Sequence, residues 1–92
     1  MKRFEDYEKA YELCYELIDQ LTKLNKESDG YFTFDIKTGY KNLYPRLRVE
    51  YCGTYYYSFF PQEDGTFSIK ENEDSYTKDE VEMKIRKNFY FD

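Results

Sequence analysis

Residues 45–60, PRLRVEYCGTYYYSFF, constrain the fold most, because they predict two strands that fold back on each other at Gly53. In the first strand Leu47 and Val49 alternate with arginines, the period-two pattern of a strand with one buried face. The second strand is apolar at almost every position, so its own pattern does not indicate which face is buried. The length of the turn therefore decides how the aromatic residues pack.

A three-residue turn of Tyr51, Cys52 and Gly53 is the predicted connection, because glycine adopts the closing left-handed conformation at least cost. A two-residue turn would instead bury the alternate set, Tyr56, Ser58 and Phe60. The three-residue turn sets these pairs: Val49 with Tyr55 and Leu47 with Tyr57 on the inner face, and Arg48 with Tyr56 on the outer face.

A second hairpin supports the same inner face. Residues 63–65, EDG, predict another three-residue turn with glycine last, followed by the strand TFSIK. This register pairs Phe59 with Ile69 and brings Phe67 to the same face. Two separate turns agree, and such consistency favours the assignment.

The remaining elements follow from local patterns. Apolar residues at helical spacing from Phe4 to about Lys26 predict a long N-terminal helix with Cys14 in its buried stripe. Residues 31–37, YFTFDIK, alternate as a strand does. Thr77 followed by Glu80 predicts a capping box, and with it a short second helix over residues 78–88.

The predicted order is a helix, a four-stranded antiparallel meander and a helix, in one compact domain of residues 1–92. The sheet offers one apolar face, so both helices are expected on that face of a two-layer α+β fold. The expected inner-face residues are Phe32, Phe34, Ile36, Leu47, Val49, Tyr55, Tyr57, Phe59, Phe67 and Ile69. This order resembles the double-stranded-RNA-binding domain in topology. That family carries a lysine cluster at the start of its second helix, where this chain has Thr77, Lys78, Asp79 and Glu80, so no binding residue is carried over.

The charge and the residue types exclude several classes of function. Nineteen acidic against fourteen basic residues give a net charge of −5, which argues against nonspecific binding to nucleic acid or anionic membranes. The chain has no histidine, and Cys14 and Cys52 show no metal-site spacing, so neither a metal nor a cofactor is expected. The two cysteines are expected as free thiols. No leader or membrane span is predicted, and the expected location is the cytoplasm.

The acidic residues of the first helix recur every three or four positions and should share one side of it. Such like-charge pairs each cost about 0.2–0.5 kcal/mol. We interpret this side as a surface that imitates nucleic-acid phosphates and docks a basic protein surface. The other interpretation is a solvated face that serves solubility. The candidate contact residues are Glu5, Glu8, Glu12, Glu16 and Asp19, with Glu71, Glu73 and Asp74.

These features predict a small non-catalytic binding protein that inhibits its partner. Its size, acidity and tyrosine content are similar in style to those of small phage or plasmid proteins that inhibit host defence, including anti-CRISPR proteins. Catalysis is not expected, because the chain has no histidine base, no glycine-rich phosphate loop and no activated thiol. Asp35 and Glu50 are the one carboxylate pair that neighbouring strands could bring together.

An alternative hypothesis places binding on the outer face of the sheet, where basic and aromatic residues together would hold single-stranded nucleic acid. A further alternative is a homodimer through the same face, so the chain is expected as a monomer or a homodimer. Asp35 and Glu50 interrupt this face and would repel phosphate. The residues of the outer face are Tyr40, Lys41, Arg46, Arg48, Tyr56 and Phe60, together with Tyr44.

Overall fold

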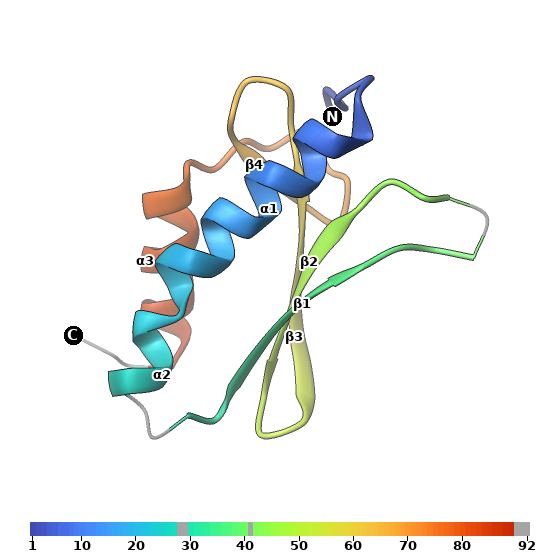
Figure 1. The fold of residues 1–92 in the computed structure, drawn as a ribbon. Coiled ribbons are helices and arrows are strands. Elements are labelled where there is room, and N and C mark those ends of the chain that lie inside the picture. Colours follow the sequence, from blue (N-terminus) through green and yellow to red (C-terminus); the bar gives the residue numbers. More distant parts are fainter. Residues whose placement is uncertain (28–29, 41, 90–92) are drawn as a thin grey trace.

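The computed structural model describes residues 1–27, 30–40 and 42–89. Four strands form one antiparallel sheet in the order β1-β2-β3-β4, and α1 and α3 lie on the same face of it (Figure 1). The predicted two-layer α+β fold is therefore confirmed. The elements are α1 (Tyr7–Leu21), α2 (Lys23–Glu27), β1 (Phe32–Lys37), β2 (Arg46–Tyr51), β3 (Thr54–Pro61), β4 (Phe67–Ile69) and α3 (Lys78–Asn88).

The first helix begins later than its apolar pattern predicts. Asp6 is the N-cap, and its carboxylate accepts a hydrogen bond of 2.9 Å from the backbone N–H of Glu8. Such a cap satisfies one of the backbone donors left free at a helix start. Phe4 therefore lies in the segment before α1, where it still packs against the core.

The predicted long helix is also divided near its end. The Thr22 hydroxyl lies 2.8 Å from the backbone carbonyl oxygens of both Ile18 and Asp19. Threonine bonds of this kind compete with regular helix hydrogen bonding and bend helices. The short helix α2 follows as a separate element that buries Leu24.

The second predicted helix is confirmed as α3. The Thr77 hydroxyl accepts from the backbone N–H of Glu80 at 3.2 Å, and the Glu80 carboxylate accepts from the backbone N–H of Thr77 at 3.0 Å. These two bonds form the expected capping box. Val81 and Ile85 then bury their side chains in the core.

The turn between β2 and β3 is shorter than predicted. Tyr51 pairs directly with Thr54, so only Cys52 and Gly53 form the turn. Their φ angles are 53° and 80°, and two-residue turns of type I′ require positive φ at both positions. The prediction of a three-residue turn was wrong, because it kept the left-handed conformation for glycine alone.

A β-bulge after this turn adds one residue to β3, so that Tyr57 and Phe59 lie on the face predicted for them. Glu50 pairs with Tyr55 and Val49 pairs with Tyr57, which leaves Tyr56 as the extra residue. The predicted pairs of Val49 with Tyr55, Leu47 with Tyr57 and Arg48 with Tyr56 are therefore wrong. The observed partners of Leu47 and Arg48 are Phe59 and Ser58.

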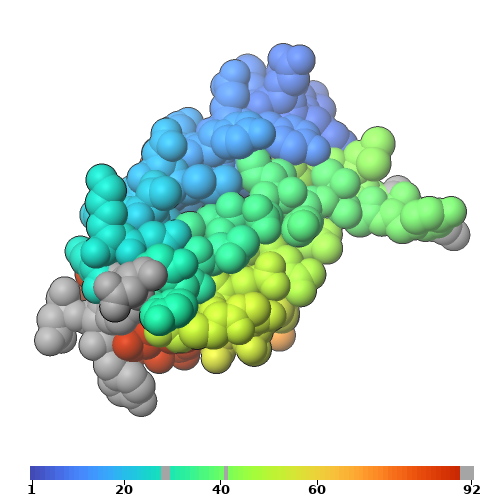
Figure 2. All heavy atoms as spheres, turned by 60° about the horizontal axis from the view of Figure 1, so that its bottom comes forward, coloured from blue at the N-terminus to red at the C-terminus, as the bar shows by residue number. Residues whose placement is uncertain are grey.

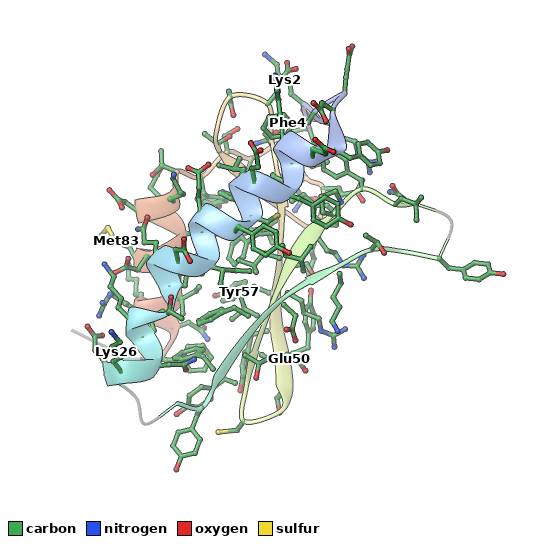
Figure 3. All side chains as sticks on the ribbon, viewed as in Figure 1. Lys2, Phe4, Lys26, Glu50, Tyr57 and Met83 are labelled. Carbon is green, nitrogen blue, oxygen red and sulfur yellow. The ribbon has the colours of Figure 1, made fainter. Side chains whose placement is uncertain are left out.

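The bulge also decides which tyrosines face the helices. Tyr57 and Phe59 reach the inner face as predicted, and Tyr57 points from β3 toward the helix layer (Figure 3). Tyr55 was predicted inside but lies on the outer face, where the Arg48 guanidinium stands 4.9 Å from the centre of its ring. Tyr56 was predicted outside but turns toward α3, with its ring 4.8 Å from that of Phe89.

The β3–β4 hairpin matches its prediction. Phe59 pairs with Ile69, and Gly65 closes the turn with φ of 87°. The backbone N–H of Gln62 bonds to the carbonyl of Thr66 at 2.8 Å, which closes a three-residue turn. The main core lies between the sheet and the helices, and its buried members are Leu13, Cys14, Leu17, Leu21, Leu24, Phe32, Leu47, Val49, Phe59, Phe67, Val81 and Ile85.

A second, smaller cluster of Ala10, Tyr44 and Phe60 lies under the N-terminal segment. The Tyr44 hydroxyl accepts from the backbone N–H of Phe4 at 3.0 Å and donates to the carbonyl of Pro61. Tyr44 and Phe60 were predicted on an exposed outer face, and this was wrong. Residues distant in the sequence cover both side chains.

Candidate partner-binding surface

The outward side of α1 carries most of the predicted contact residues. Ala10, Leu13, Cys14, Leu17 and Leu21 bury the opposite side of this helix. Because α-helical neighbours on one side recur every three or four residues, the acidic positions share the outer side. The exposed acids of this side are Glu8, Glu12, Glu16 and Asp19; Glu5 is exposed just before the helix.

One of these acids is neutralised by the chain itself. Glu16 forms an ion pair of 2.7 Å with Lys78 at the start of α3. Glu8, Glu12 and Asp19 form no ion pair with any residue that the structure describes. The outer side of α1 therefore keeps three unpaired negative charges. We call these three acids, together with Tyr15, the α1 acidic face.

Two basic side chains, Lys23 and Arg86, join the helices to one another through ion pairs. Lys23 lies 2.9 Å and Arg86 lies 2.7 Å from the carboxylate of Glu82, and Arg86 also binds Glu27 at 2.7 Å. Burial alone would raise the pKa of Glu82, but hydrogen bonds from Lys23, Arg86 and Gln20 outweigh it and lower the pKa. This network ties α1, α2 and α3 together and leaves the α1 acidic face unneutralised.

Tyr15 lies within the acidic face, and the sequence analysis missed it. It stands three residues after Glu12 and four before Asp19, and it is 59% exposed. The sequence could have indicated it, because Tyr15 lies outside the apolar stripe of α1 and an aromatic residue there does not pack into the core. Exposed tyrosines are frequent anchors in protein interfaces, so Tyr15 joins the candidate residues.

The acids of the β4–α3 connection have structural partners. Glu71 binds Arg3, and Glu73 lies 3.3 Å from the amino group of Met1. Asp74 is half-buried and accepts a hydrogen bond of 3.0 Å from the backbone N–H of Ile69. Glu71 and Glu73 hold the N-terminal segment, whereas Asp74 binds the end of β4, and the structure does not bring the three acids to the α1 acidic face as free charges.

The outer sheet face does not assemble as the alternative hypothesis requires. Phe60 is buried and Tyr56 turns toward α3. Arg48 lies over the ring of Tyr55, and its Nε is 4.0 Å from Glu50, while Arg46 is half-buried.

Two further residues of that hypothesis, Tyr40 and Lys41, belong to the β1–β2 connection. This connection projects from the body of the molecule (Figure 2), and Tyr40 is 97% exposed there. Lys41 falls outside the described residues. The aromatic platform that would stack bases is therefore divided among separate places.

The described residues show no candidate metal site. They contain no group of three cysteine, aspartate or glutamate side chains placed to hold a metal ion. Asp35 pairs with Arg48 and Glu50 pairs with Thr33, so the two carboxylates do not stand opposite each other. Both cysteines are free, and burial raises the pKa of Cys14 to about 12.

Within residues 1–27, 30–40 and 42–89, none of the helices has the length and apolar character needed to cross a bilayer. Comparison of the chain with protein-family models, with curated proteins and with solved structures gives no match.

Proposed function

We propose that this chain is a small non-catalytic binding protein that docks its α1 acidic face on a basic protein surface. The observation that carries the proposal is the exposure of Glu8, Glu12 and Asp19 around Tyr15, where none of the three forms an ion pair with a described residue. Like charges at helical spacing destabilise a helix by about 0.2–0.5 kcal/mol per pair. A partner that supplies positive charge would offset this cost and accounts for acids at these positions.

The chemistry of the face favours arginine in the partner. A guanidinium binds carboxylates through two parallel hydrogen bonds and also stacks on aromatic rings, whereas an ammonium acts as a point charge. Glu12 and Asp19 offer carboxylates on either side of the Tyr15 ring, so one arginine has both kinds of contact within reach. Arginine-lined grooves are common in proteins that bind nucleic acid.

A partner of that kind would be inhibited by competition. Carboxylates along α1 occupy the positions that phosphates take in the groove, and electrostatic complementarity raises the association rate and the selectivity. This mode of action corresponds to an anti-defence protein in the anti-CRISPR style. We extend the proposal to that class of partner, a nucleic-acid-binding protein of a host defence system.

The absence of catalysis is part of the proposal, and the pKa shifts of three side chains agree with it. A nucleophilic cysteine needs a thiolate, which the raised pKa of Cys14 disfavours. Hydrogen bonds lower the pKa values of Glu27 and Asp64, and a general acid or base near neutral pH needs the opposite shift in a carboxyl.

The test is an NMR titration of the ¹⁵N-labelled protein with a nona-arginine peptide and, separately, a nona-lysine peptide. Nona-arginine should shift the amide signals of Glu12, Tyr15 and Asp19 most, and nona-lysine should bind more weakly. Glu12→Lys should reduce the affinity for nona-arginine by about tenfold, a loss of about 1.4 kcal/mol.

The matched control is Glu63→Lys, because Glu63 is an exposed acid on the β3–β4 turn and the two variants have the same net charge. This control should keep most of the affinity. Equal losses in both variants would mean that only net charge matters, and the proposed surface would be abandoned.

A further inference from the structure

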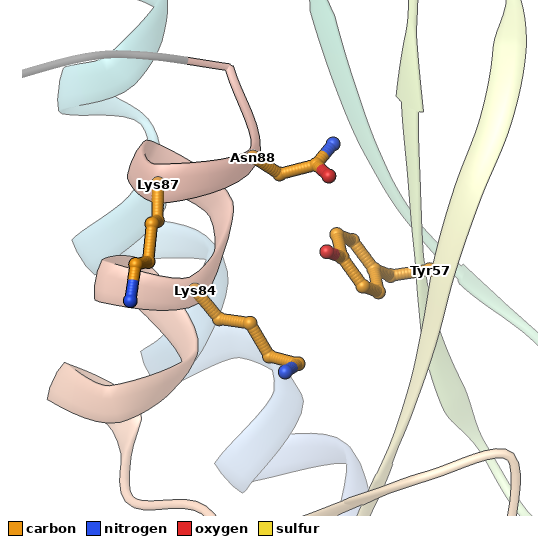
Figure 4. A pocket seen from close by; sticks show the side chains of 4 residues that line it. All are labelled: Tyr57, Lys84, Lys87 and Asn88. Atoms are coloured by element: carbon orange, nitrogen blue, oxygen red, sulfur yellow. The ribbon is translucent and has the colours of Figure 1, made fainter.

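A shallow groove of about 300 Å³ lies between α3 and β3. The described residues that line it are Tyr57, Lys84, Lys87 and Asn88. Figure 4 shows the Tyr57 hydroxyl, the Asn88 amide and the Lys84 side chain extending into the space between the helix and the strand, with Lys87 beside them on the helix. The three helical residues share one side of α3, because they are spaced by three and four positions.

The groove collects hydrogen-bond donors and positive charge. Each lining side chain offers an N–H or O–H donor, and none of the described lining residues is acidic. Neither Lys84 nor Lys87 forms an ion pair with a described residue, although Lys78 on the same helix does. The Lys84 ammonium lies 5.2 Å from the centre of the Tyr76 ring, and this cation–π contact holds the side chain in place on α3. In a chain with a net charge of −5, this is a local site for an anion.

We propose that this groove binds a small phosphorylated ligand of the size of a nucleoside monophosphate. Phosphate oxygens accept hydrogen bonds only, which matches the ammonium groups of Lys84 and Lys87 and the Asn88 amide. The Tyr57 hydroxyl, which points toward α3 (Figure 4), adds a further donor for the phosphate or for a sugar attached to it. The volume lies at the lower end of the range for small-molecule sites, which suits a small ligand. This site is separate from the α1 acidic face and does not depend on the proposed function.

The experiment is an NMR titration of the ¹⁵N-labelled protein with adenosine 5′-monophosphate, with inorganic phosphate and with adenosine. The monophosphate should produce saturable shifts at Tyr57, Lys84, Lys87 and Asn88. Inorganic phosphate should shift the helical residues with lower affinity, and adenosine should shift little. Lys84→Gln should lower the affinity for the monophosphate about tenfold, as expected for a lost charge-assisted hydrogen bond.

Lys26→Gln is the matched control, because Lys26 is an exposed lysine on α2 and its loss changes the net charge equally. It should leave the affinity unchanged. Lys87→Gln is a second variant that keeps the contact of Lys84 with Tyr76, and it should weaken binding about threefold. The proposal is overturned if no saturable shift occurs at roughly 10 mM monophosphate, if Lys26→Gln and Lys84→Gln weaken binding equally, or if adenosine binds as well as the monophosphate.

Discussion

Replacement of Glu12 by lysine should stabilise the fold while it removes the central charge of the proposed interface. Glu12 faces like charges at Glu8 and Glu16, four positions away on each side, and one opposite charge at Lys9, three positions before it. With about 0.2–0.5 kcal/mol per pair, reversing two repulsions and one attraction yields a net gain of about 0.4–1.0 kcal/mol. For a domain of this size, that corresponds to a rise in melting temperature of roughly 2–8 °C.

The gain should be measured by urea unfolding, followed by circular dichroism at low and at high ionic strength. Glu12→Gln should give about half the effect, about 0.2–0.5 kcal/mol, because it removes the pair energies without inverting them. Both gains should vanish near 1 M salt, where the Debye length is about 3 Å. A loss of stability in Glu12→Lys at low salt would refute the reasoning, since it would mean that attraction to a base of the chain outweighs the repulsion from Glu8 and Glu16.

Three further predictions concern the scaffold. Glu82→Gln should lower the free energy of unfolding by about 1.5–3 kcal/mol at neutral pH, because it weakens charge-assisted bonds to Lys23 and Arg86. The lowered pKa of Glu82 means that this stability is present above its unfolded pKa, near the ordinary value of 4.5, and is lost as the pH falls through the folded pKa. Urea unfolding at pH 7 and at pH 3 should therefore show a smaller acid-induced loss in the variant. Cys52→Asn should raise the stability by about 0.5 kcal/mol, because asparagine tolerates the positive φ of a type I′ turn, and a lower melting temperature would argue against that geometry. Ser68→Ala should be neutral or stabilising by up to about 1 kcal/mol, because the buried Ser68 hydroxyl has no hydrogen-bond partner among the described residues, whereas a clear loss would reveal one.

Local signals were sufficient to predict α3 and the β3–β4 hairpin. The capping box at Thr77 and Glu80 and the turn that ends at Gly65 each depend on residues close together in the sequence. The β2–β3 connection could not be predicted in the same way. A cysteine at positive φ is uncommon, and the bulge at Tyr56 has no signature in a run of aromatic residues.

The acidic residues of the candidate site could be predicted from the sequence, but the residues that pack and pair around them could not. The spacing of Glu8, Glu12 and Asp19 fixes their common side of the helix once the buried stripe is known. The pairing of Glu16 with Lys78 joins residues 62 positions apart, and no local pattern encodes it. The burial of Phe60 likewise depends on Tyr44 and on the N-terminal segment, which are brought together only by the complete fold.

The central claim is that the α1 acidic face contacts a basic partner, and zero-length carbodiimide cross-linking in an extract of the native host tests it most directly. This reagent joins a carboxylate to a primary amine within contact distance, so it reports lysines that lie beside the partner's arginines, and mass spectrometry identifies both joined residues. We predict cross-links from Glu8, Glu12 or Asp19 to one basic protein, lost at high salt and in Glu12→Lys but kept in Glu63→Lys. Cross-links confined to other acids, such as Glu63 or Glu50, would contradict the claim.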